Sequence, residues 1–152
     1  MTSIDFYILG QTQHNDRLLF ACRLAERVYA EGRRVYVHVA SEQEAQYMDD
    51  LMWSHKPESF LPHSIVGQAT TTQAGADSLN TDTQVQIGFG EHPQHHSDVM
   101  INLVSPLPNF FSRFDRVLEV VIQDEQVLQQ TREHYKFYKD RGYEVTHRDL
   151  RG

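Results

Sequence analysis

The densest group of possible metal ligands lies between Glu91 and Asp98, in the segment EHPQHHSD. Imidazole nitrogens and carboxylate oxygens are ligands for zinc and other transition metals. The three histidines lack the spacing of a helical metal motif, and a loop holds ligand geometry poorly. A solvated turn between two strands explains the His92–Asp98 loop equally well. We therefore expect no metal, and a metal-dependent enzyme is the alternative that this loop leaves open.

Signals for nucleotide binding or nucleophilic catalysis are weak. Gly10 ends an apolar run ahead of a helical pattern, where a phosphate could contact a helix N-terminus. The segment ILGQTQHND nevertheless has neither G-x-G-x-x-G spacing nor a Walker lysine. Cys22, the single cysteine, lies in an apolar helical pattern typical of a small buried residue. The sequence thus predicts no cofactor and no catalytic site, with a nucleotide-dependent enzyme as a further alternative.

Positive charge is concentrated near the C-terminus. Residues 35–112 contain one lysine and nine acidic residues, whereas residues 132–148 contain five basic and three acidic ones. Arg132, Lys136 and Lys139 fall within about 60° of one another on a helix, beside an apolar face. Cations near a helix C-terminus are favoured by the helix dipole alone. Alternatively, this basic rim beside aromatic surface suits a short acidic and hydrophobic peptide.

Composition excludes several classes of protein. The chain has 152 residues, 39% of them hydrophobic, and a net charge of −7, so it can build a core but lacks the basic surface that duplex DNA or an anionic membrane requires. No run approaches the roughly 20 apolar residues of a membrane span, and the N-terminus lacks the pattern of a signal peptide. We expect a cytoplasmic protein with no specific DNA binding and no membrane contact.

Strand and helix patterns alternate along the chain, which is typical of a parallel sheet with helices on both faces. We predict a single three-layer α/β domain over residues 1–152 with a mostly parallel central sheet. The expected helices are Asn15–Glu31, Ser41–Met52 and Asp124–Arg141, with a helical turn at Asn109–Phe114. The expected strands are Ser3–Leu9, Val35–Val39, Val85–Phe89, Val99–Val104, Val117–Ile122 and an edge strand at Tyr143–Thr146.

The segment LMWSHKPESFLPH (Leu51–His63) contains the single tryptophan, and Phe60 stands between two prolines. A tryptophan just past a helix end can fill a gap in the core. It can equally anchor a protein partner, because its ring supplies a large contact area at a small entropic cost.

Five segments together resemble the chi subunit of bacterial DNA polymerase III. They are FYIL, LMWSHKPESFLPH, SDVMINL, FDRVLEVV and REHYKFYKDRGYEV, in this order and at this spacing. The resemblance implies a Rossmann-like fold without a working nucleotide site. It also implies an accessory subunit of the polymerase holoenzyme in DNA replication, with no enzymatic activity of its own.

The resemblance further implies two partners, the psi subunit of the clamp-loader complex and the acidic, phenylalanine-ended C-terminal tail of single-stranded DNA-binding protein. The residues implied for binding the tail are Trp53, Arg132, Tyr135 and Lys136, with Lys139 at the rim. The residues implied for binding psi are Phe60, Leu61 and Pro62. His134 departs from the more basic helix of the family, and we expect it to lower affinity for the tail or make it depend on pH.

Overall fold

The computed structural model describes residues 2–54, 63–65, 85–89 and 98–151. Its helices are α1 (His14–Ala30), α2 (Glu42–Ser54), the 3-10 turn η2 (Phe111–Arg113) and α4 (Glu125–Asp140). Its strands are β1 (Ser3–Ile8), β2 (Val35–His38), β3 (His63–Ile65), β4 (Val85–Gly88), β5 (Val99–Asn102), β6 (Arg116–Val121) and β7 (Glu144–Asp149). Among the described residues, no helix has the length and apolar character needed to cross a membrane.

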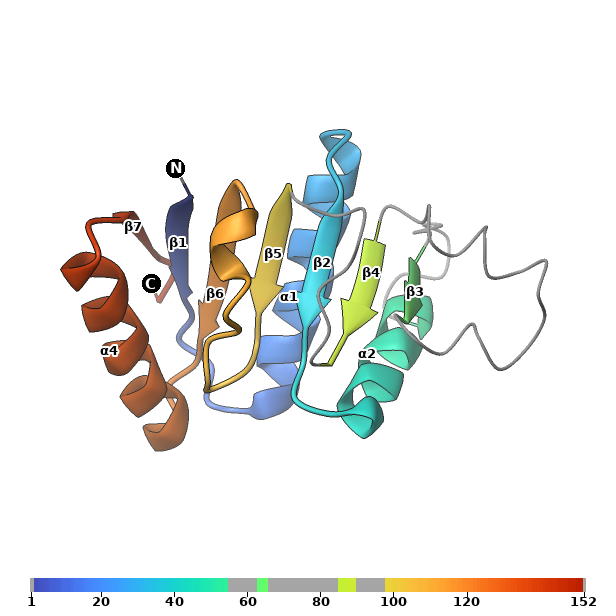
Figure 1. The fold of residues 1–152 in the computed structure, drawn as a ribbon. Helices are drawn as coiled ribbons and strands as arrows, with labels where there is room; N and C mark the ends of the chain where they lie inside the picture. The colour runs from blue at the N-terminus through green and yellow to red at the C-terminus, as the bar shows by residue number, and fades with distance from the viewer. Residues whose placement is uncertain (1, 55–62, 66–84, 90–97, 152) are drawn as a thin grey trace.

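The seven described strands form one sheet in the order β3-β4-β2-β5-β6-β1-β7 (Figure 1). All of their pairings are parallel, which confirms the predicted α/β class and parallel sheet. β3 is a strand that the sequence analysis did not predict. The predicted edge strand at Tyr143–Thr146 exists as β7, but it begins one residue later and extends to Asp149 along β1.

Helices cover both faces of the sheet, as predicted for a three-layer fold. Neighbouring residues of β1 show this directly, because successive side chains of a strand point to opposite faces. Tyr7 contacts Phe20 of α1, whereas Phe6 contacts Tyr135 and Tyr138 of α4. α1 packs against α2 and the central strands, and α4 packs against β6 and β7 at one end of the sheet (Figure 1).

The core fills the space between these layers with apolar side chains. Cys22 in α1 is fully buried, and burial raises the pKa of its thiol to about 12. A thiol with so high a pKa is not a nucleophile at neutral pH. This agrees with the interpretation of Cys22 as a small core residue.

Both ends of α4 are held by local hydrogen bonds. Asp124 is the N-cap, and its carboxylate accepts a hydrogen bond of 3.2 Å from the backbone N–H of Val127. At the other end Gly142 has φ +83°, and the N–H groups of Gly142 and Tyr143 donate to the carbonyls of Lys139 and Tyr138. This Schellman arrangement reverses the chain from α4 directly into β7.

We predict that Gly142→Ala destabilises the protein by about 1 kcal/mol, because a side chain strains backbone at positive φ. Urea denaturation followed by circular dichroism measures the change. Gly10→Ala is the matched control, since a Cβ there makes only ordinary contacts of 3.6 Å or more with Arg151. Equal stability of Gly142→Ala and wild type would contradict the assignment of this turn.

Candidate functional site

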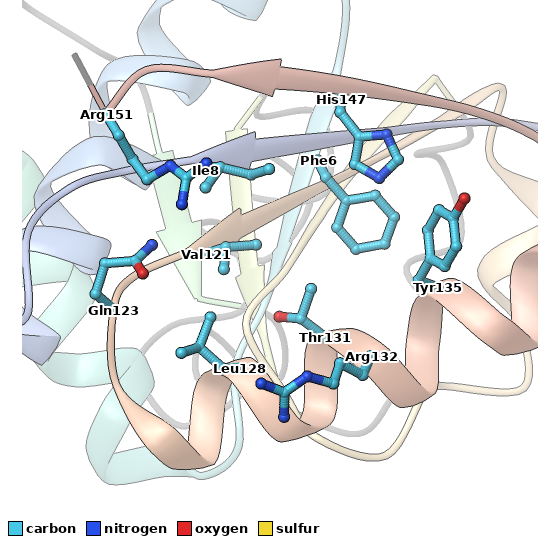
Figure 2. Close-up of a pocket in the computed structure, with 10 residues that line it drawn as sticks. All are labelled: Phe6, Ile8, Val121, Gln123, Leu128, Thr131, Arg132, Tyr135, His147 and Arg151. Carbon is cyan, nitrogen blue, oxygen red and sulfur yellow. The ribbon is translucent and has the colours of Figure 1, made fainter.

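A pocket of about 380 Å³ lies between α4 and the β1–β7 end of the sheet (Figure 2). Its lining residues are Phe6, Ile8, Val121, Gln123, Leu128, Thr131, Arg132, Tyr135, His147 and Arg151. Ile8 and Val121 are the last residues of β1 and β6. The pocket therefore extends to the carboxyl ends of parallel strands, which is the usual side for ligand sites in such sheets.

α4 contributes one continuous stripe to this pocket. Its residues are spaced three or four positions apart, so they lie on one face of the helix. They are Leu128, Thr131, Arg132 and Tyr135. The stripe carries one aliphatic side chain, one threonine whose hydroxyl donates to the Val127 carbonyl, one guanidinium group and one aromatic ring. Such a surface can bind an apolar group and an anion at the same time.

Three rings close one end of the pocket. His147 of β7 stacks on Phe6 of β1, with ring centroids 5.6 Å apart. Tyr135 of α4 lies 5.1 Å from His147 and 6.2 Å from Phe6, again between centroids. Tyr135 keeps 37% of its surface exposed, so its ring is available to a ligand.

A buried network behind the pocket attaches α4 to the sheet. The carboxylate of Glu119 in β6, only 2% exposed, accepts hydrogen bonds from His134 Nδ1 at 2.9 Å and from the Tyr138 hydroxyl at 2.7 Å. The other ring nitrogen of His134, Nε2, donates to the carbonyl oxygen of Ser105. Both ring nitrogens thus face acceptors, an arrangement that favours the doubly protonated imidazole and its ion pair with Glu119.

The pKa of His134 reflects two opposing causes. Burial lowers it, but the hydrogen bond and negative charge of Glu119, with the Ser105 carbonyl, outweigh burial and raise the pKa above its usual value. Because the ring is buried against the sheet, it does not line the pocket. The expectation that His134 lowers affinity for the tail or makes it depend on pH stays a prediction, and any such effect would act through the position of α4.

Arg151 and Gln123 stand at the end of the pocket away from the rings (Figure 2). Gln123 Nε2 donates to the Leu9 carbonyl at 2.9 Å, which holds the loop after β6 against β1. Arg151 donates to both carboxylate oxygens of Asp149, at 3.0 and 2.7 Å. These hydrogen bonds lower the pKa of Asp149 to about 2.

Two of the predicted tail-binding residues, Arg132 and Tyr135, line this pocket together. Lys136 and Lys139 are exposed on the same helix, one and two turns beyond Arg132. They extend the positive charge of the pocket toward the C-terminal end of α4. The structure therefore brings these four predicted residues onto one helix surface.

Trp53, the fifth predicted tail-binding residue, stands in another part of the fold, and its role in binding the tail stays a prediction. Trp53 lies in α2, which packs against α1, β3 and β4. Four strand spacings, about 19 Å, separate β4 from β1, and α2 covers the face opposite α4 (Figure 1). The two helices are thus at different ends and on different faces of the sheet.

The remaining predicted residues fall largely outside the described part of the chain. These are Phe60, Leu61 and Pro62 of the psi-binding prediction and residues 92–97 of the histidine loop. Asp98 is described, and its carboxylate accepts a hydrogen bond of 2.9 Å from the Arg34 backbone N–H. Within the described ranges, no three histidine, cysteine or acidic side chains are grouped as metal ligands.

Five residues on the sheet side of the pocket were not predicted from the sequence, namely Phe6, Ile8, Val121, His147 and Arg151. Phe6, Ile8 and Val121 were assigned only to strands, and nothing in their spacing indicated which face they occupy. Arg151 carried a weak signal as a further base beyond the basic stretch at residues 132–148.

Comparison with known proteins assigns the family. The family model described as DNA polymerase III chi subunit, HolC, matches residues 1–146. The chain belongs to the chi subunit family of DNA polymerase III. It is 35% identical over 143 residues to the chi subunit of Pseudomonas aeruginosa, covering 94% of this chain and 93% of that protein. It is 28% identical to the chi subunit of Escherichia coli, covering 95% of this chain and 96% of that protein.

Solved structures resemble this chi-family chain in fold alone. The C-terminal domain of the DEAD-box protein Dbp5 aligns with a TM-score of 0.65 at 14% identity, covering 97% of this chain and 90% of that one. Domain 2 of the DEAD-box helicase Mss116p aligns with a TM-score of 0.65 at 7% identity, covering 97% and 64%. The Rossmann-like prediction thus agrees with a sheet architecture that helicase domains also use.

We predict that the stability of the protein falls as pH rises above about 6.5, the usual pKa of an unfolded histidine. The raised folded-state pKa of His134 stabilises the protein below that pH, and this contribution is lost as pH rises through the folded pKa. His134→Gln should remove this slope and cost about 3 kcal/mol near pH 6, because Glu119 then loses its buried counter-ion.

Urea denaturation at several pH values between 6 and 8 measures both effects, because above about pH 8.5 the buried thiol of Cys22, with its raised pKa, adds a slope of its own. His147→Gln is the matched control, because it removes an exposed imidazole from the same end of the sheet and should retain the wild-type slope. A slope that persists in His134→Gln would show that the ion pair with Glu119 does not form.

Proposed function

We propose that this chi-family chain is a non-catalytic accessory subunit of the DNA polymerase III holoenzyme. In this proposal it binds the psi subunit of the clamp loader and the acidic C-terminal tail of single-stranded DNA-binding protein. The observation that carries the second link is the pocket beside α4, which combines an apolar floor with Arg132. A replication subunit acts where the DNA is, so the proposal includes the cytoplasmic location expected from the sequence.

The pocket chemistry supports a peptide that ends in phenylalanine. Such a chain end offers an aromatic ring and a carboxylate within one residue. Ile8, Val121 and Leu128 supply an apolar floor for the ring, and Arg132 supplies a guanidinium group for the carboxylate. A pocket of about 380 Å³ is large enough for one aromatic side chain and its flanking backbone.

The charge distribution supports an acidic partner. The whole chain carries a net charge of −7, which disfavours direct binding to DNA. Lys136 and Lys139 nevertheless form a local basic surface beside the pocket. Acidic residues upstream of the chain end would pair with these exposed lysines, and such pairs contribute modestly and weaken with salt.

We predict that Arg132→Ala weakens binding of an acidic peptide ending in phenylalanine by about 10- to 150-fold, the range for a lost hydrogen bond to a charged group. Fluorescence anisotropy with a labelled peptide measures the change. Arg23→Ala is the matched control, because Arg23 is an exposed arginine on α1, across the sheet. Unchanged affinity of Arg132→Ala would remove Arg132 from the binding site.

The link to psi is proposed for the segment that contains Phe60, Leu61 and Pro62. We predict that Phe60→Ala abolishes binding to psi and leaves binding of the acidic peptide intact, because α4 and its pocket are built from other parts of the chain. Co-elution with purified psi in size-exclusion chromatography tests the first half, and anisotropy tests the second. Co-elution of Phe60→Ala with psi at wild-type stoichiometry would contradict this surface.

A further inference from the structure

The pocket beside α4 has two chemically different ends. Figure 2 shows the rings of Phe6, His147 and Tyr135 grouped at one end and Arg151 at the other. The Arg132 side chain extends along α4 away from the rings, toward Leu128. Two guanidinium groups therefore border the part of the pocket that the rings do not occupy.

Arg151 is positioned by the chain around it, although its side chain is 53% exposed. The N–H of Leu150 donates to the Ile8 carbonyl at 2.8 Å, which carries the chain beyond β7 alongside β1. The backbone of Arg151 lies close to Gly10, and Asp149 accepts from its backbone N–H and its guanidinium group. Asp149 uses only the Nε and Nη2 atoms, so other N–H groups of the guanidinium remain for a ligand.

We propose that Arg151 and Arg132 together form a subsite for the free C-terminal carboxylate of the bound peptide. This inference rests on the proposed function, and it adds both a second binding residue and a direction for the peptide. The carboxylate lies between the two guanidinium groups, and the terminal side chain lies on the apolar floor. The upstream residues then pass Tyr135 toward Lys136 and Lys139.

The charges around Arg132 support this direction. A polar hollow of about 490 Å³ lies on the other side of Arg132, lined by Ser105, Glu125, Gln126, Gln129, Gln130 and Glu133. Its two carboxylates would repel an acidic chain, whereas the lysines on the later turns of α4 attract one. The reverse direction would place the terminal carboxylate among the three rings and leave Arg151 without its ligand.

The test compares one acidic peptide ending in phenylalanine in two forms, with a free C-terminal carboxylate and with a C-terminal amide. Calorimetry at low salt measures both against wild type, Arg151→Gln and Arg148→Gln. Arg148 is the matched control, because it lies on the opposite face of β7, over Tyr7 and near Asp5. We expect Arg151→Gln to weaken binding of the free-acid peptide by about 5- to 20-fold, a modest loss because the hydrogen bond it removes is partly exposed. Binding of the amide should weaken by less than about 2-fold.

The two proposals fail in different ways. The carboxylate subsite is wrong if Arg151→Gln binds both peptides with wild-type affinity, or if its affinity for both falls by the same factor. In either case, weaker peptide binding by Arg132→Ala would still support the proposed function. If the free-acid peptide does not bind the wild-type protein, both proposals are wrong. Arg148→Gln should bind both peptides like wild type.

The peptide direction is tested by a spin label on the upstream end of the free-acid peptide. We expect it to broaden the backbone NMR signals of Lys136 and Lys139 more strongly than those of Glu125 and Gln126. Stronger broadening around Glu125 would overturn the proposed direction.

Discussion

The buried pair of Glu119 and His134 is the constraint on which the candidate site depends. A carboxylate at 2% exposure inside a parallel sheet needs a counter-charge and hydrogen-bond donors. His134 and the Tyr138 hydroxyl supply them from α4. Because α4 is attached by its inner face, the stripe from Leu128 to Tyr135 is held beside β1, β6 and β7, and the pocket forms along that contact.

The position of this pocket differs from that of the nucleotide site in Rossmann-type sheets, which lies over a glycine-rich turn after the first strand. The sheet resembles those of helicase domains at 7% and 14% identity, a level that shows only a shared fold. Here the pocket lies at the edge of the sheet rather than over a glycine-rich turn after β1. Its floor is apolar and its charged groups are arginines, and the proposed binding of a peptide chain end depends on both.

The two proposed interactions would use different segments of the chain. The acidic peptide is assigned to α4 and its pocket, whereas the psi-binding prediction concerns the segment after α2. α2 and α4 lie at opposite ends of the sheet (Figure 1). Under the proposed function, the chain therefore has separate segments for its two partners.

Local patterns in the sequence determined most of the helices and strands, because apolar spacing, capping residues and glycine at helix ends act over a few residues. They also placed Arg132 in a basic stripe beside the apolar face of the last helix, whereas the family resemblance supplied Tyr135 as a binding residue. Only the tertiary structure decided that Trp53 lies apart from them, and that Phe6, His147 and Arg151 join them. The order of strands in a parallel sheet depends on contacts between distant segments, and spacing along the chain does not encode those contacts.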